Sequence, residues 1–100
     1  MSIIFVGHRF EGKAEDIARA MKITRELQIS DVDNCYICPS IALMHLRKGE
    51  IDSHAEMELK KDLLMLCDKM IVASSVTPEL QEQIELAKRC HLEVKYLERD

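Results

Sequence analysis

The chain has 100 residues, of which 47% are apolar, and its formal net charge is −4. This length suits one small globular domain, and the apolar fraction is sufficient for a real core. The negative charge argues against binding to a nucleic-acid backbone, and no apolar run approaches the roughly 20 residues of a membrane span. The opening residues are too short an apolar run for a signal peptide and lack a basic leading region, so we expect a cytoplasmic protein.

The first segments predict a strand, a polar loop and a helix. Residues 2–6 form an apolar run that Gly7 ends, and glycine there lets the backbone approach a ligand closely. In the polar loop that follows, Arg9 and Lys13 could meet an anion, and a simple turn with solvated charges fits equally well. Residues 14–27 then carry apolar side chains at spacings of three and four, which is typical of an amphipathic helix.

The second strand is predicted at residues 35–38 and carries Cys35 and Cys38 with the CxxC spacing of some metal sites. Residues three apart on a strand point to opposite faces, so these two thiols would not share one metal ion. Cys67 and Cys90 fall on apolar helical positions, where free cysteine is commonly buried. We therefore expect reduced thiols, no metal site and no cofactor.

The central segment is the least regular part of the chain. Residues 41–52 fit either a short helix or an ordered loop over the site, and Gly49 is expected to break it. Ser53 and Glu56 have the spacing of a capping box, which predicts a helix from residue 54 to about residue 67.

The last third predicts a buried strand at residues 70–74, a polar loop, a helix and a final strand at residues 92–97. Thr77 is the expected N-cap of this helix, and Pro78 suits its first position because a proline has no N–H to leave unpaired. Glu79 lies in the first turn, where the helix dipole favours negative charge.

Strands that alternate with helices predict an α/β fold with a parallel sheet and right-handed crossovers. For four strands, a three-layer, flavodoxin-like (Rossmannoid) order 2-1-3-4 is the most economical arrangement. The loops after Gly7 and Ser74 would then face each other between the first and third strands. Ligands of open α/β sheets bind in such a crevice, beyond the carboxyl ends of the strands.

Three segments resemble the nucleoside 2-deoxyribosyltransferase-like superfamily. Residues 3–10 resemble its opening strand and Gly-containing loop, residues 67–72 resemble its Cys-Asp or Ala-Asp pair before a strand, and residues 78–94 resemble its Gly-x-x-x-Glu-Ile-x-x-Ala helix. Small phage and bacterial proteins share this order. The resemblance implies one flavodoxin-like domain whose relatives cleave or transfer the N-glycosidic bond of nucleosides or nucleotides. It also implies a helix Glu as nucleophile and an active site often completed by a neighbouring subunit.

The chain departs from this pattern at the position of the family's catalytic nucleophile. The family's nucleophilic Glu falls on Gln83, its helix-opening Gly falls on Glu79, and the Pro after its first Gly falls on His8. Glutamine cannot form the glycosyl ester that a carboxylate forms, but it can hydrogen-bond a ribose hydroxyl.

Three explanations of Gln83 are open. The protein can be a binding descendant without catalysis, it can carry a deliberate Glu-to-Gln change that traps substrate, or the alignment can be off by two, which makes Glu85 the nucleophile. Residues two apart on a helix point about 200° apart, so Gln83 and Glu85 cannot both face the site.

The first hypothesis is therefore a nucleoside- or nucleotide-binding domain with weak or no catalysis, for example a phage-type protein that sequesters a signalling nucleotide. Its expected ligand-binding residues lie in the two facing loops and at the helix start: Gly7, His8, Arg9, Phe10, Ser74, Ser75, Thr77 and Glu79.

The second hypothesis is an active N-glycosidase or deoxyribosyltransferase. In this hypothesis the nucleophile is Glu85, Glu79 or Glu82. The acid that assists the leaving base is Asp68, Asp62 or Glu58. The third is an interaction module with a vestigial pocket. In each case a domain this small would leave an apolar helix face uncovered, around residues 41–46 or 57–66, and this predicts a homodimer or higher homo-oligomer.

Overall fold

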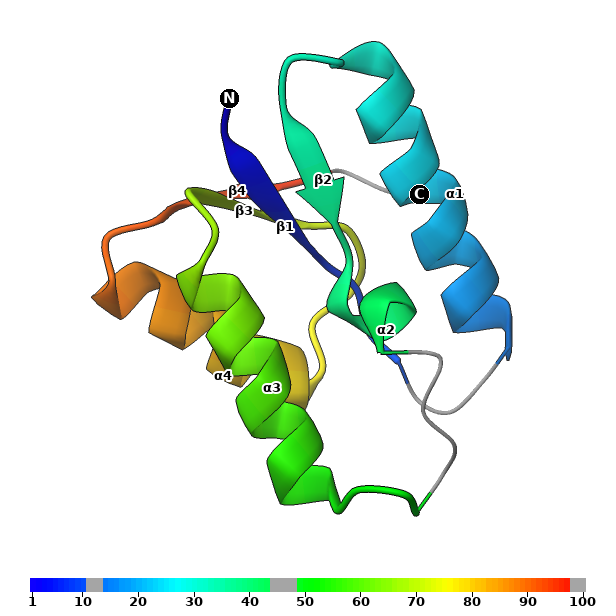
Figure 1. The fold of residues 1–100 in the computed structure, drawn as a ribbon, viewed down its shortest axis with the longest axis vertical. Coiled ribbons are helices and arrows are strands. Elements are labelled where there is room, and N and C mark those ends of the chain that lie inside the picture. Colours follow the sequence, from blue (N-terminus) through cyan, green and yellow to red (C-terminus); the bar gives the residue numbers. More distant parts are fainter. Residues whose placement is uncertain (11–13, 44–48, 98–100) are drawn as a thin grey trace.

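The computed structural model describes residues 1–10, 14–43 and 49–97, in which strands and helices alternate (Figure 1). The strands are β1 (Ile3–Gly7), β2 (Cys35–Ile37), β3 (Lys69–Val72) and β4 (Glu93–Tyr96). The helices are α1 (Ala14–Ser30), α2 (Pro39–Ala42), α3 (Ser53–Met65) and α4 (Pro78–Arg89). The predicted strands and the three longer helices are present, with ends shifted by a few residues at most, whereas the short helix α2 begins at Pro39, two residues before the segment 41–52 that was left open between a helix and a loop. Lys13 and residues 44–48 lie outside the described residues.

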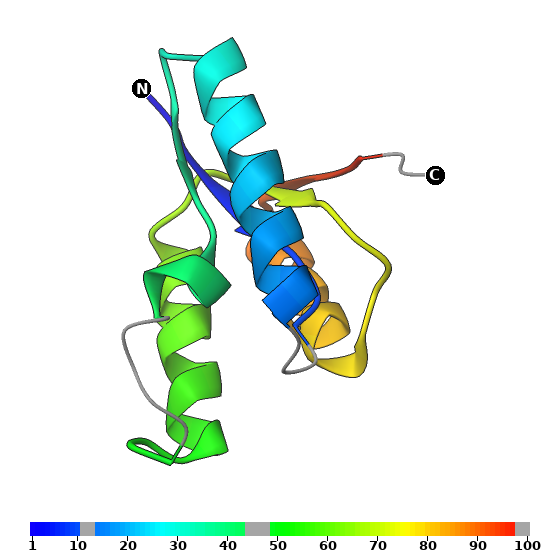
Figure 2. The same ribbon diagram turned by 90° about the vertical axis from the view of Figure 1, so that its right-hand side faces the viewer.

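The strands form one parallel sheet of order β2-β1-β3-β4, which confirms the predicted fold. Helix α1 lies on one side of the sheet and helices α3 and α4 lie on the other (Figure 1 and Figure 2). Gly7 at the end of β1 is in register with Val72 at the end of β3, and the Ala73 amide donates to the Gly7 carbonyl at 2.8 Å. The switch point between these strands is where the chain was expected to bind a ligand.

Each face of the sheet has its own apolar cluster, because strand side chains alternate between the two faces. The cluster beneath α3 and α4 contains Phe5, Leu64, Cys67, Met70, Val72, Leu80, Ile84 and Ala87. The cluster beneath α1 contains Val6, Ala20, Ile23, Cys38 and Ala73. Burial of each large side chain of this kind stabilises the fold by about 1.5–3 kcal/mol, so both faces hold the three layers together.

The start of α4 is as predicted, and the start of α3 is not. The Thr77 hydroxyl accepts a hydrogen bond from the Leu80 amide at 3.3 Å, with Pro78 as the first helical residue. At α3 the N-cap is Asp52, whose Oδ1 accepts from the Ala55 amide at 2.7 Å, and Ser53 already belongs to the helix. A carboxylate at this position also interacts favourably with the helix dipole, which explains why the cap lies one residue earlier than expected.

The four cysteines are free, and one of them is not where the sequence placed it. Cys67 and Cys38 are buried, whereas Cys90 is exposed because it caps the carboxyl end of α4, beyond the last buried turn. Within the described residues, no three metal-ligating side chains are grouped to hold an ion. No helix in the described part of the chain has the length and apolarity to cross a membrane.

Gly7 has a packing role at the end of β1. A Cβ at this position would lie 2.8 Å from Leu80 Cδ1 and 2.8 Å from Met70 Cε, both of which are buried. The space beside the Gly7 Cα therefore holds core side chains, and the missing side chain lets α4 pack closely against the sheet.

Candidate functional site

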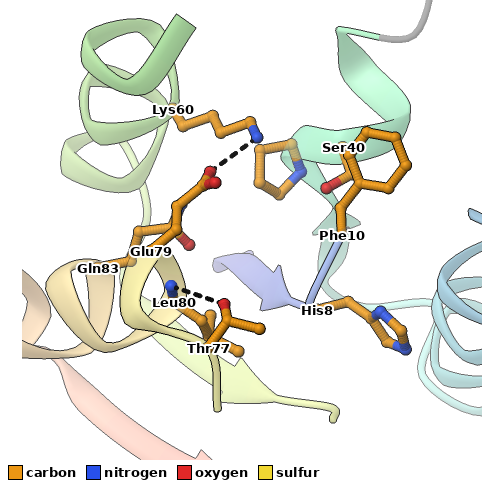
Figure 3. A pocket seen from close by; sticks show the side chains of 9 residues that line it. His8, Phe10, Ser40, Lys60, Thr77, Glu79, Leu80 and Gln83 are labelled. Carbon is orange, nitrogen blue, oxygen red and sulfur yellow. Dashed lines mark hydrogen bonds and ion pairs between the residues drawn. The ribbon is translucent and has the colours of Figure 1, made fainter. Parts of the chain in front are cut away.

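A pocket at the carboxyl end of the sheet, which we call the Gln83 pocket, brings together five residues predicted from the sequence (Figure 3). They are His8, Phe10, Thr77, Glu79 and Gln83. The loop after β1 supplies the first two, and the first two turns of α4 with its cap supply the others. Pro39 and Ser40 of α2, Lys60 of α3 and Leu80 complete the walls.

Gln83 lies one helical turn after Glu79, and both side chains line the pocket because residues four apart share a helix face. Gln83 is only 4% exposed, and its neighbour Ile84 belongs to the core, as the spacing predicted. No residue in the described part of the chain makes a hydrogen bond to the Gln83 amide group. Within the described residues, the one fully buried side-chain atom without a partner is Thr24 Oγ1, so the Gln83 amide reaches solvent in the pocket and is available to a molecule there.

Lys60 is the principal residue of the pocket that sequence reasoning missed. It is 4% exposed, and its Nζ lies 2.9 Å from Glu79 Oε1 (Figure 3). The same Nζ lies 3.4 Å from Glu56 Oε1. A buried lysine needs such partners, because an unpaired charge away from water is very costly. Its position three after Met57 and four before Leu64, on the apolar stripe of α3, was the available signal.

The other acidic candidates on α3 and α4 point elsewhere. Glu82 is exposed and lies 4.0 Å from Lys61, and Glu85 is exposed and accepts a hydrogen bond from Gln81 at 3.3 Å. Asp62 and Glu58 of α3 are exposed as well. Of the six carboxylates considered from the sequence, Glu79 is the one that lines the Gln83 pocket.

Asp68 lies at the opposite edge of the sheet. Its Oδ2 accepts from the Ile3 amide at 2.8 Å, and its own amide donates to the Ile3 carbonyl at 2.8 Å. A residue that precedes a parallel strand belongs to the amino edge, away from the ligand crevice. The structure therefore does not bring Asp68 together with Gln83.

Arg9, Ser74 and Ser75 form a separate group on the α1 side of the same edge. The Arg9 amide donates to Ser74 Oγ at 2.8 Å, and its guanidinium donates to Ser75 Oγ at 2.7 Å. The Arg9 Nε also lies 3.5 Å from the buried carboxylate of Asp16. The predicted ligand-binding residues other than Gly7 thus divide between two cavities, and His8 lines both of them, whereas Gly7 lines neither.

The Gln83 pocket is narrow and opens beside a larger cavity. Its free volume of about 10 Å³ is roughly that of one water molecule. The neighbouring cavity has a volume of about 510 Å³ and shares Phe10, Lys60 and Glu79 with it. Residues from the start of α3 line the rest of this cavity: Ser53, His54, Glu56 and Met57.

Comparison with known proteins identifies a similar fold. No family model matches the sequence, and no curated protein matches it. Among solved structures, the chain resembles a 2-desoxiribosyltransferase from Leishmania mexicana. The TM-score is 0.73 at 11% sequence identity, and the match covers 100% of this chain and 66% of that one. At this identity the likeness shows the fold, which is the three-layer α/β arrangement that the sequence predicted.

Proposed function

We propose that this domain binds a nucleoside or nucleotide, with Gln83 contacting the sugar, and that it leaves the glycosidic bond intact. The Gln83 side chain is the observation that carries the proposal, because the residue is only 4% exposed, lines the pocket and makes no side-chain hydrogen bond within the described residues. A ribose or deoxyribose hydroxyl at this point would satisfy the amide.

The two adjoining cavities fit different parts of such a ligand. The Gln83 pocket admits one group the size of a hydroxyl, whereas the neighbouring 510 Å³ falls within the roughly 300–1,000 Å³ of small-molecule sites. Phe10 is 36% exposed and lines both cavities, so its ring offers a surface on which a base can stack. Such stacking contributes about 1–3 kcal/mol and tolerates any base.

The chemistry of position 83 supports binding without turnover. An amide cannot form a covalent glycosyl ester, and it does not stabilise oxocarbenium charge as a carboxylate does. The exposed position of Glu85 supports the alignment that places the family's nucleophile at Gln83. A protein that binds without turnover lowers the free concentration of its ligand, which suits the sequestering role in the cytoplasm considered above.

Isothermal titration with a panel of nucleosides and nucleoside 5′-monophosphates tests the proposal. We expect affinities in the micromolar range or better, and no free base by chromatography after long incubation. Gln83→Ala should weaken binding about tenfold, which corresponds to one lost hydrogen bond. Gln81→Ala is the matched control, because Gln81 lies on the exposed face of the same helix. Failure of every compound to bind would overturn the proposal.

An active N-glycosidase is the second candidate, and the position of Glu79 is the observation that favours it. Glu79 is the carboxylate of α4 that lines the Gln83 pocket, where Lys60 holds it at 2.9 Å. This candidate predicts that base is released from a nucleoside or nucleotide, that Glu79→Gln abolishes the release, and that Glu82→Gln retains it. Absence of base release from the whole panel would exclude it.

We also infer that the domain self-associates through α3. Apolar side chains of this helix and just beyond its end are exposed, and this is the kind of surface that an interface covers. They are Leu59, Met65 and Leu66. Sedimentation should detect a dimer that Leu66→Lys weakens, and a monomer at high concentration would contradict the inference.

A further inference from the structure

The cavity on the α1 side of the carboxyl edge, which we call the α1 cavity, is lined by basic side chains. Its volume is about 510 Å³. Arg9 enters it from the loop after β1, and Arg19 and Lys22 enter it from adjacent turns of α1. Ser74 and Ser75, in the loop after β3, line it as well.

The charges around this cavity are only partly compensated. Asp16 is paired with Arg9 at 3.5 Å. Arg19 lies 3.8 Å from Glu15, and the Glu15 side chain is 76% exposed. An exposed pair of this kind is weak, because water screens it. Lys22 has no ion pair within the described residues. The α1 cavity is thus positively charged in a chain whose net charge is −4.

Its hydrogen-bonding groups are held in place before any ligand arrives. Ser75 Oγ and Asp16 fix the Arg9 guanidinium, and Ser74 Oγ accepts from the Arg9 amide. The His8 Nδ1 lies 2.7 Å from the Arg9 carbonyl oxygen, which can only accept, so Nδ1 carries the hydrogen. The His8 ring turns away from Gln83 in Figure 3, and its Nε2 is the ring nitrogen left for a ligand.

We propose that the α1 cavity binds the phosphate group of a phosphorylated small molecule, at a site distinct from the Gln83 pocket. Guanidinium, ammonium and hydroxyl groups are the donors that bind phosphate oxygens, and the two cations on α1 neutralise a dianion. Ser75 is the hydroxyl donor here, because the Ser74 hydroxyl donates to the Ser75 carbonyl at 3.0 Å. His8 is the residue that both sites share. The phosphate can belong to a nucleotide, a sugar phosphate or inorganic phosphate, and these sources present the same oxygens.

Amide chemical shifts of the isotope-labelled protein, recorded at constant ionic strength, test the proposal. Inorganic phosphate, ribose 5-phosphate and a nucleoside 5′-monophosphate should each give saturable shifts at Arg9, Ser74 and Ser75, and the strongest binder identifies the source. An unphosphorylated nucleoside should leave the Ser74 and Ser75 amides unchanged, whereas Arg9 can respond because its neighbour Phe10 lines the nucleoside cavity. Absence of saturable shifts with all three phosphates would overturn the proposal.

A double substitution on α1 separates a site from general charge attraction. Arg19→Gln with Lys22→Gln should weaken phosphate binding roughly tenfold or more, since charged hydrogen bonds are the strong ones. Lys61→Gln with Lys88→Gln removes the same charge from α3 and α4 and should leave the affinity unchanged. Equal weakening by both pairs would show that only net charge matters and would overturn the site.

A last variant distinguishes this site from the proposed nucleoside pocket. Gln83→Ala should keep the response of the α1 cavity to inorganic phosphate, whatever it does to nucleoside binding. Loss of the phosphate response in Gln83→Ala would overturn the claim that the sites are distinct. Nucleoside binding that survives with no phosphate response would retain the nucleoside pocket and remove the phosphate site.

Discussion

The two edges of the sheet use polar side chains in opposite ways. At the amino edge, Asp68 and Asn34 each accept from a backbone amide of the first strand segment at 2.8 Å. Gln28 nearby makes three hydrogen bonds with the backbone of the turn and strand that follow α1. At the carboxyl edge, Gln83 and Lys22 line cavities and have no such partner within the described residues.

This difference separates structural polar groups from groups that can meet a ligand. A polar residue beside a strand is weak evidence for a site, because loops at either edge need side chains to satisfy their backbone groups. The stronger evidence is a polar side chain that lines a cavity and lacks a protein partner at the edge where ligands bind. Substitutions at the amino edge should therefore reduce stability, and those at the carboxyl edge should reduce affinity.

The largest effect on stability is expected from Gln28→Ala at the amino edge. Its Nε2 donates to the carbonyls of Asp31 at 3.1 Å and Asn34 at 2.7 Å, and its Oε1 accepts from the Tyr36 amide at 2.9 Å. Loss of these bonds should lower the free energy of unfolding by about 2–3 kcal/mol, as urea denaturation measures it. Gln81→Ala, on the exposed face of α4, should change it by less than about 0.5 kcal/mol. Similar losses in both variants would remove the distinction.

The pH dependence of stability is the next largest effect, and a buried thiol at each edge causes it. Burial raises the pKa of Cys67 to about 11 and also raises the pKa of Cys38. The unfolded chain ionises these thiols at lower pH than the folded chain does. Stability is therefore complete below about pH 9 and falls as the pH rises towards about 11, by on the order of 2 kcal/mol for Cys67. Urea denaturation over this range measures the slope.

Variants identify the thiol at the amino edge as a source of this slope. Cys67→Ala should make the dependence on pH shallower without removing it, because Cys38 still contributes. Cys90→Ala should leave the slope unchanged, since Cys90 is exposed. A slope that persists in full without Cys67 would contradict the assignment.

What the sequence predicted well depends on local or periodic interactions. Thr77 and Pro78 mark a helix start through contacts within one turn, and the period of α4 buries Ile84 and therefore turns Gln83 towards the pocket. The sheet order follows from the alternation of elements and the short crossovers between them.

What the sequence did not predict depends on partners far apart in the chain. The apolar stripe of α3 could have predicted that Lys60 is buried, but its partner Glu79 lies 19 residues later in the chain, and no local pattern contains that distance. Arg19 and Lys22 look like solvated helix residues until the loop after β3 is placed beside them. The position of Asp68 could have been predicted from the sequence, because a residue directly before a parallel strand lies at the amino edge of the sheet.

Asp68→Ala tests that assignment and should have a modest effect. Loss of the hydrogen bond from the Ile3 amide at 2.8 Å should cost about 1 kcal/mol, because water replaces part of it at this exposed position. Nucleoside affinity should equal that of the unchanged protein in the same titration. A loss of affinity with unchanged stability would mean that Asp68 belongs to the site.

The smallest effect on stability is expected from Lys60→Met at the carboxyl edge. Methionine fits the buried path of the lysine stem, and the Glu79 and Glu56 side chains that lose their partner are each 41% exposed and remain in contact with water. The free energy of unfolding should therefore change by less than about 1 kcal/mol, since replacing a buried ion with an apolar group is often neutral. Nucleoside affinity should fall, and Lys61→Met should preserve both properties. A loss of 3 kcal/mol or more, the cost of an uncompensated buried charge, would instead make the Lys60–Glu79 pair part of the framework. The carboxyl edge would then resemble the amino edge, and the argument for a site would rest on Gln83 alone.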